Sequence, residues 1–210
     1  MKVDGKPVFA IYHQGNFLAD FGGVEGSAKA IKELRKACRN SGFEGIVVCM
    51  EDRTGNEVRL RQMSSMGIDY AYAYTWGTGN TEMQRKKMEA QREAAGAGLG
   101  VLPSFSVGWE PTPWGKAGDG WASVEDYKAL AWWTRNTYMP TLPADSLGAT
   151  MVLLPNWNEF AEGHFIMPST LAGFGYLDGL REVFCGGGQH DDAVPTEAQK
   201  RRFTLLYPKD

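Results

Sequence analysis

The stretch GIVVCM, residues 45–50, decides the fold class. It is apolar without alternation, which is typical of a strand buried on both faces of a parallel sheet. Four other short apolar runs share this character, and each is followed by a polar or glycine-rich loop and then a longer helical pattern: residues 7–12, 68–74, 100–105 and 149–155. This alternation predicts an α/β fold built from five parallel β/α units.

Capping residues mark the helices between these runs. Ser27 is expected to cap a helix whose left-handed end falls at Gly42. Asn80 is expected to cap the next helix, and Ser123 with Asp126 resembles a capping box for a third. Apolar residues at positions 171, 174, 177, 180 and 184 form a stripe that predicts a last helix. A helix is therefore expected after most of the apolar runs.

Two segments of the chain differ in character. Residues 1–185 hold the five β/α units, which we interpret as one partial barrel domain. The tail, residues 186–210, begins with three glycines and predicts only a short terminal helix that starts at Thr196 and Gln199. Five units leave two unpaired strand edges, which further strands of a longer parent protein or a second copy of the chain would cover. A self-contained, doubly wound sheet is the alternative fold.

Composition excludes several classes of partner. The formal net charge is -3 and no basic run exceeds three residues, so we expect no nucleic-acid partner. No apolar stretch approaches the roughly 18 to 20 residues of a membrane span, and the first residues lack a signal-peptide layout. We therefore expect a soluble chain, and the sequence does not assign its cellular compartment. Three widely spaced cysteines form neither a disulfide framework nor a zinc-ligand pattern, and no cofactor motif occurs.

The loop after the last apolar run carries the densest chemistry. Residues 156–164 read NWNEFAEGH, and they place two carboxylates, Glu159 and Glu162, beside four other polar or aromatic side chains: Asn156, Trp157, Asn158 and His164. A separation of three residues puts both carboxyl groups on one side of a turn, as cleavage of a glycosidic bond requires. The alternative is that both are solvated loop acids near a helix N-terminus.

Other strand ends are expected to line the same pocket, because the carboxyl ends of parallel strands meet at one edge of a sheet. They contribute Tyr12, Glu51, Tyr74, Trp76, Trp109 and Glu110. The chain is rich in aromatic residues (12%), and we interpret Tyr12, Trp76 and Trp109 as platforms for sugar rings. Glu51 belongs equally well to an ordinary turn with Asp52. The histidines show no metal-ligand spacing, so no metal is expected.

The loop and its flanks resemble a known family. Residues 157–164, followed by Pro168 and residues 175–177, are similar to the WNEWxEG signature of WbsX-like proteins, which are related to glycoside hydrolase family 99. Upstream, residues 3–12 resemble a mid-barrel strand of the family, and residues 103–113 resemble its GWDNTPR loop. Most of the chain is therefore included in the resemblance.

The resemblance implies a fold and a chemistry. The fold is that of the C-terminal five units of a (β/α)8 TIM-type barrel, incomplete in this chain, and the expected activity is a glycoside hydrolase acting on α-linked glycans, including mannose-containing ones. In family 99, the first glutamate of the motif deprotonates the sugar 2-hydroxyl and the second acts as acid and then as base. By position, Glu159 would be that base and Glu162 the acid/base.

The sequence departs from the family at three places. Phe160 replaces the second tryptophan of the signature, residues 166–168 lack the carboxylate of the family's LEP segment, and residues 109–114 lack the amide and the arginine of WDNTPR. The carboxylate pair is intact. The family's sugar specificity therefore does not transfer with it.

Two other functions stay open on the same residues. Members of the WbsX-like group are also labelled glycosyltransferases of polysaccharide (O-antigen) biosynthesis, although nothing in this sequence resembles a nucleotide-diphosphate site. A truncated barrel that binds glycans without catalysis is the non-enzymatic alternative. In each case the expected partner is an oligosaccharide or a polysaccharide.

Overall fold

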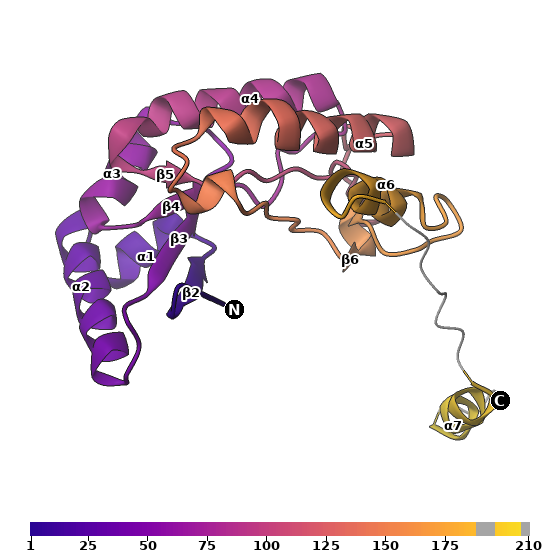
Figure 1. Ribbon diagram of the computed structural model, residues 1–210, viewed down its shortest axis with the longest axis horizontal. Coiled ribbons are helices and arrows are strands. Elements are labelled where there is room, and N and C mark those ends of the chain that lie inside the picture. The colour runs from indigo at the N-terminus through magenta and orange to yellow at the C-terminus, as the bar shows by residue number, and fades with distance from the viewer. Residues whose placement is uncertain (188–195, 207–210) are drawn as a thin grey trace.

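The computed structural model describes residues 1–187 and 196–206, and its centre is a parallel sheet. Strands β2 (Lys6–Ile11), β3 (Val47–Glu51), β4 (Tyr70–Tyr72) and β5 (Gly100–Val101) lie side by side in chain order. Strand β1 (Lys2–Val3) pairs antiparallel with β2 at one edge. The chain forms an arc, with the strands on its inner side and the helices outside (Figure 1). The α/β fold with a parallel sheet is confirmed.

Helices connect these strands and continue beyond them. The α-helices are α1 (Gln14–Asp20), α2 (Val24–Asn40), α3 (Glu57–Met66), α4 (Thr81–Ala95), α5 (Val124–Trp133), α6 (Gly175–Phe184) and α7 (Glu197–Leu206). Short turns occur at η1 (Gly96–Gly98), η2 (Thr112–Trp114), η4 (Met139–Thr141) and η5 (Leu147–Ala149), and a π-helical turn, η3, spans Thr134–Tyr138. No helix in the described part of the chain is long and apolar enough to cross a bilayer.

The two faces of the sheet bury different residues. Val48 and Met50 of β3 pack in the cluster that joins the sheet to α2 and α3. Cys49, between them, belongs to another cluster that includes Tyr72 of β4. Because side chains alternate along a strand, Glu51 lies on the same concave face as Cys49. The fold thus directs a carboxylate to the inner side of the arc, at the carboxyl end of β3.

The prediction of a fifth strand over residues 149–155 is wrong. Only Leu153 pairs there, in one parallel bridge to Ser104 with its amide donating to the carbonyl of Pro103 at 2.8 Å. Pro103 has no N–H group and so removes a ladder hydrogen bond at this point. The same proline accounts for β5 being shorter than the predicted run 100–105. The other three runs contain most of β2, most of β3 and all of β4.

The predicted helix ends have mixed outcomes. Asn80 and Ser123 cap α4 and α5 as expected, each accepting a hydrogen bond of 3.0 Å from a backbone amide three residues on. Gly42 has the expected positive φ, +86°, just after α2. Ser27 as a cap is wrong, because α2 begins at Val24 and Ser27 is buried within it. Gly23, with φ of +96°, makes the turn that starts the helix earlier.

The C-terminal segment also differs in part from expectation. Helix α6 begins at Gly175, so Leu171 and Phe174 of the predicted stripe precede it and are exposed. Thr196 and Gln199 form the expected start of α7, with the backbone amide of Thr196 donating to Gln199 Oε1 at 2.8 Å. The rest of the predicted tail, residues 188–195 and 207–210, lies outside the described residues.

Candidate functional site

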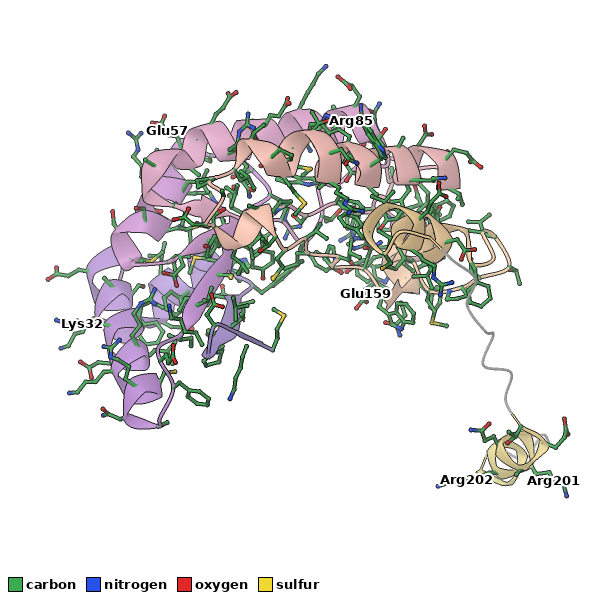
Figure 2. The ribbon with its side chains drawn as sticks, in the orientation of Figure 1. Lys32, Glu57, Arg85, Glu159, Arg201 and Arg202 are labelled. Atoms are coloured by element: carbon green, nitrogen blue, oxygen red, sulfur yellow. The ribbon has the colours of Figure 1, made fainter. Side chains whose placement is uncertain are left out.

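The carboxylate pair lies on a short hairpin. Strand β6 (Asn158–Glu159) pairs antiparallel with β7 (His164–Phe165), and a single 3₁₀ turn, η6 (Phe160–Glu162), joins them through Gly163. Glu159 pairs with His164, and Glu162 ends the turn. Glu159 is exposed, whereas Glu162 is half-buried. Figure 2 shows Glu159 on this hairpin, on the side of the arc opposite the outer helices. The two carboxylates therefore flank one turn.

Tyr74 links the hairpin to the sheet. It follows the end of β4, and its hydroxyl donates a hydrogen bond of 2.9 Å to Glu162 Oε2. The pKa of Tyr74 is raised, first by burial, then by the hydrogen bond to Glu162 and by the negative charges of Glu162 and Glu159. Both carboxylates thus act on the same hydroxyl group. Tyr74 stays protonated and can only donate to Glu162.

His164 and Asn156 lie beneath this surface. His164 is fully buried with its ring edge-on to Tyr74, 5.0 Å between centroids, and burial lowers its pKa to about 4. Neither of its ring nitrogens has a hydrogen-bond partner within residues 1–187 and 196–206, and the same holds for both amide atoms of buried Asn156. Neither side chain reaches the surface of the chain as it is folded, and their contact with substrate stays a prediction. The His164 ring supports Tyr74 from within the fold.

Glu51 extends the site across the sheet. Its carboxylate is buried and pairs with Arg53 Nε at 2.8 Å, and Arg53 also donates to the hydroxyl of Tyr12 at 3.4 Å. The ring of Tyr12 packs edge-on against Tyr74, 5.5 Å between centroids. Burial raises the pKa of Glu51, and the Arg53 charge opposes that rise. A continuous row of polar and aromatic groups therefore connects Glu51 to Glu162.

Of the two interpretations of this segment, a sugar-binding carboxylate and an ordinary turn, the turn applies to Asp52. Asp52 makes the turn: its carboxylate accepts hydrogen bonds from the Thr54 hydroxyl at 2.6 Å and the Gly55 amide at 2.8 Å. Glu51 takes no part in that turn and faces the concave side. Arg53, which the sequence analysis did not single out, is the residue that connects Glu51 to Tyr12.

The loop over residues 108–121 docks on the hairpin. The backbone amide of Glu110 donates to the carbonyl of Glu162 at 2.8 Å, and the Trp121 indole donates to the carbonyl of Gly163. The Glu110 carboxylate accepts hydrogen bonds within its own loop, from the Thr112 hydroxyl and the Gly120 amide, and these bonds lower its pKa. Glu110 therefore positions the hairpin through its backbone, which the sequence analysis did not predict, and Trp121 was missed.

Gly163 is required at this junction. Its φ is +55°, and a Cβ atom there would lie 2.7 Å from Glu110 Cβ and 2.8 Å from the Trp121 indole nitrogen. Both approaches are shorter than carbon and nitrogen tolerate, and positive φ is unfavourable for residues with a side chain. The close packing of the loop on the hairpin therefore depends on the absence of a side chain at this position.

The predicted stacking platforms have different positions. Tyr12 is 51% exposed and Trp109 is half-buried, so both rings keep accessible area beside the site. Trp76 as a platform is wrong: it is 2% exposed, and its indole donates to the Ser104 carbonyl at 2.8 Å inside the core. On the hairpin itself, Trp157 is 52% exposed, and Asn158 is exposed next to it. The accessible aromatic area is therefore concentrated around the hairpin and the end of β2.

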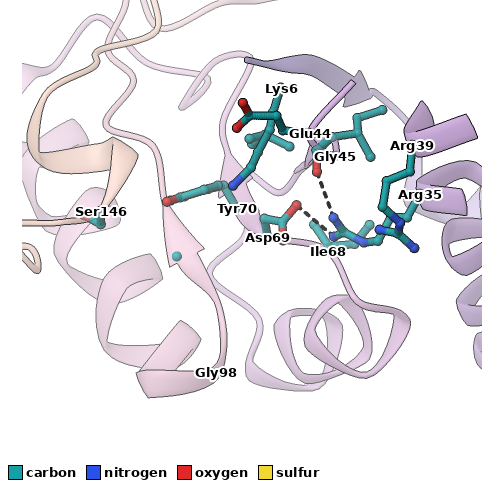
Figure 3. Close-up of a pocket in the computed structure, with 13 residues that line it drawn as sticks. Lys6, Arg35, Arg39, Glu44, Gly45, Ile68, Asp69, Tyr70, Gly98 and Ser146 are labelled. Atoms are coloured by element: carbon teal, nitrogen blue, oxygen red, sulfur yellow. Dashed lines mark hydrogen bonds and ion pairs between the residues drawn. The ribbon is translucent and has the colours of Figure 1, made fainter. Parts of the chain in front are cut away.

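A separate cavity of about 550 Å³ lies at the opposite, N-terminal end of the sheet (Figure 3). Its walls include Lys6, Arg39 and Tyr70, and Arg35 crosses it. Arg35 donates to the carbonyl of Ile46 at 2.8 Å and to Asp69 Oδ2 at 2.8 Å. Its guanidinium therefore links the segments that lead into β3 and β4. In β/α folds, this end of the sheet serves stability rather than catalysis.

In the described ranges, no three His, Cys, Asp or Glu side chains gather in a way that would hold an ion. The groups at the hairpin are instead a pair of carboxylates, a protonated tyrosine and exposed aromatic rings. This set of groups suits proton transfer to and from a hydroxyl-rich ligand.

Comparison with known proteins gives one likeness. No family model matches the chain, and no curated protein matches it. Among solved structures, it is similar to "the GH99 endo-alpha-mannosidase from Bacteroides thetaiotaomicron", with 23% sequence identity and a TM-score of 0.48. The match covers 80% of this chain and 46% of that chain, so this chain spans less than half of that protein's length. The resemblance to WbsX-like proteins stays a prediction from the motif.

Proposed function

We propose that this chain is a glycoside hydrolase-like enzyme that acts on α-linked glycans, including mannose-containing ones, with Glu159 and Glu162 as its working pair. One observation carries the proposal: the hydroxyl of Tyr74, at the end of β4, donates at 2.9 Å to Glu162, which lies on the same short hairpin as Glu159. Cleavage of a glycosidic bond needs two carboxyl groups near one bond.

The roles of the two carboxylates follow the motif resemblance. Glu159 removes the proton of the sugar 2-hydroxyl, and that oxygen attacks the anomeric carbon to form an anhydro-sugar. Glu162 gives its proton to the departing oxygen as the glycosidic bond breaks. It then takes a proton from the water that opens the anhydro-sugar, and Glu159 returns a proton to the 2-oxygen. The balance closes with one water consumed.

The neighbouring groups fit these roles. The hydrogen bond from Tyr74 holds Oε2 of Glu162, which leaves Oε1 for the departing oxygen. Tyr12, whose ring packs edge-on against Tyr74, and exposed Trp157, directly before β6, offer flat apolar area for sugar rings. Buried Glu51, with its raised pKa, is placed to hydrogen-bond a hydroxyl at the other end of the row. A sugar bound here would contact residues from three strand ends.

The test is a cleavage assay on a panel of α-linked oligosaccharides, with and without sugar nucleotide donors. Glu159→Gln and Glu162→Gln are each expected to lower kcat about 10²- to 10⁴-fold, the usual range for losing a general acid or base. Glu57→Gln is the matched control, because Glu57 is an exposed acid on α3 whose ion pair, to Arg61, is exposed as well. Its activity is expected to equal that of the wild type.

Three results would contradict the proposal. Cleavage that survives in both glutamine variants would remove the pair from the chemistry. Extension of a glycan that depends on a sugar nucleotide would assign the chain to the glycosyltransferases. Binding of the panel without turnover by the wild type would leave a glycan-binding protein without hydrolase activity.

A further inference from the structure

The outer helical layer contains a second groove, far from the carboxylate pair. An open groove of about 510 Å³ lies along α5 beside Arg85 of α4, and its volume is within the range of about 300–1,000 Å³ typical of ligand sites. The groove is lined by Arg85, Glu125, Lys128, Ala129, Trp132 and Trp133. Figure 2 shows Arg85 on the outer helices and Glu159 on the opposite side of the arc. A ligand in this groove would leave the carboxylate site free.

The spacing of residues on α5 shapes the groove. Glu125, Lys128, Ala129 and Trp132 recur three or four residues apart, so they form one stripe along the helix. Ala129 is the smallest of them, and its short side chain leaves space beside the Trp132 ring. Trp132 is 57% exposed, which is unusual for the largest of side chains. The groove therefore presents a flat aromatic face next to a hollow.

The floor of the groove is held rigid. The Arg85 guanidinium lies over the Trp133 ring, 5.4 Å from its centroid, and the Tyr138 ring lies 5.5 Å from the same indole. Tyr138 is fixed in turn by its hydroxyl, which donates to the Met88 carbonyl at 3.0 Å. The π-helical turn η3 starts directly after Trp133, and such turns are frequent at functional sites. Little ordering is therefore needed when a ligand binds.

The charged side chains of the groove differ in whether they are already paired. Lys128 is committed to an ion pair with Glu182 of α6, at 2.5 Å. The Nε atom of Arg85 is buried without a hydrogen-bond partner in the described part of the chain. Glu125 is exposed and makes no hydrogen bond or ion pair there. Half-buried Arg85 and exposed Glu125 therefore place one cation and one anion on the walls of the groove beside Trp132, which suits a neutral ligand that both donates and accepts hydrogen bonds.

We propose that this groove is a second glycan site, in which the apolar face of a pyranose ring lies on Trp132 while Arg85 and Glu125 hydrogen-bond its hydroxyls. The choice of a glycan rests on the proposed function, because a polysaccharide that the hairpin cleaves carries further sugar units that a second site can bind. The groove would anchor the chain of a polymer and leave catalysis to the hairpin.

A second copy of the chain is a poorer occupant. Stable protein interfaces bury about 800 Å² on each partner, mostly around several large apolar anchors. Within helices α4 and α5, which are described in full, the exposed large hydrophobic residues are only Met83 and Trp132. One aromatic face with charged neighbours is too small an area for a dimer. It is sufficient for one or two sugar units.

The test is native affinity electrophoresis in gels that contain α-mannan, dextran or soluble starch. The wild type is expected to be retarded by at least one of them, and Trp132→Ala to bind that polymer about fivefold to tenfold more weakly. Trp132→Phe keeps an aromatic face and is expected to retain most of the retardation. Met83→Ala is the matched control, an exposed apolar residue of α4 outside the groove. Circular dichroism checks that each variant folds.

Further variants keep the outcome decisive. Glu125→Ala, a change at an exposed residue, is expected to weaken retardation even if Trp132→Ala fails to fold. Glu162→Gln is expected to be retarded as strongly as the wild type. If Glu162→Gln still cleaves glycans while the groove variants lose retardation, the proposed function fails and the groove proposal stands.

Two outcomes would overturn the proposal. One is a wild type that none of the three polymers retards, or groove variants that are retarded as strongly as the wild type. The other is a dimer, measured by light scattering, that Trp132→Ala converts to a monomer, because the face would then belong to self-association.

Discussion

The two ends of the parallel sheet differ in how completely their polar groups are paired. At the N-terminal end, Asp69 accepts hydrogen bonds from the Val48 amide and from Arg35, and Arg35 also donates to two backbone carbonyls. At the carboxyl end the carboxylates of Glu51 and Asp52 are also paired, but both ring nitrogens of His164 and both amide atoms of Asn156 lack partners within the described residues. Buried polar atoms without partners are costly and call for an explanation, of which a functional role is one.

The largest expected effect concerns His164 and pH. In the unfolded chain this side chain gains a proton near pH 6.5, whereas burial holds its folded pKa at about 4. Between these values the unfolded state binds more protons, so stability that is complete above pH 6.5 is lost as pH falls toward 4. The free energy of unfolding is expected to drop by about 2 kcal/mol between pH 7 and pH 5 from this residue alone.

Urea unfolding at several pH values isolates that contribution. His164→Leu, which cannot titrate, is expected to lose about 2 kcal/mol less than the wild type over the same interval. His13→Asn is the matched control, because His13 is an exposed cap of α1 and asparagine caps equally well. An identical pH slope in wild type and His164→Leu would contradict the difference between the two sheet ends.

A smaller effect is expected from the hydroxyl of Tyr74. Tyr74→Phe removes the hydrogen bond to Glu162 without removing the ring, so Glu162 loses its positioning and not its neighbours. On a glycan that the wild type cleaves, kcat is expected to fall about tenfold, roughly 1.4 kcal/mol, with little change in KM. Tyr127→Phe serves as the control, because that buried hydroxyl has no partner in the described chain. Equal losses in both variants would indicate a general packing effect.

The smallest effect is expected at the N-terminal end. Asp69→Asn keeps the size of the side chain but removes the charge that pairs with Arg35, and it is expected to cost about 1 kcal/mol of stability because the pair is partly exposed. Activity should not change, since this end is remote from the hairpin. Glu57→Gln, which breaks an exposed pair with Arg61, should change the unfolding free energy by no more than about 0.5 kcal/mol. A loss of activity in Asp69→Asn would contradict the assignment of the N-terminal end of the sheet to stability alone.

Patterns that depend on neighbours in sequence predicted the structure well. The non-alternating run at residues 45–50 contains most of β3, and Asn80 and Ser123 cap their helices, because each needs only residues within one turn. Ser27 failed as a cap because Gly23, four residues earlier, already turns the chain into the helix. Local signals compete, and the sequence does not rank them.

Features that depend on residues far apart in the chain escaped prediction. Trp76 follows a strand end like Tyr74, yet it turns into the core toward Ser104, which only the folded sheet brings near. Arg53 and Trp121 hold the candidate site through contacts to Tyr12 and Gly163, at sequence separations of about 40 residues. No periodicity records such contacts. The carboxylate pair itself was found from its local density of polar groups, and its role stays a prediction.

Because Gly163 has no side chain, the loop over residues 108–121 packs directly against the backbone of the hairpin. The loop that carries Glu110 and Trp121 is bonded to the carbonyls on either side of the η6–β7 junction. A longer or shorter loop between residues 111 and 119 would therefore pull directly on the carbonyl of Glu162. Changes in the length of that loop would therefore shift the position of the Glu162 carboxylate without changing any residue next to Glu162 in sequence.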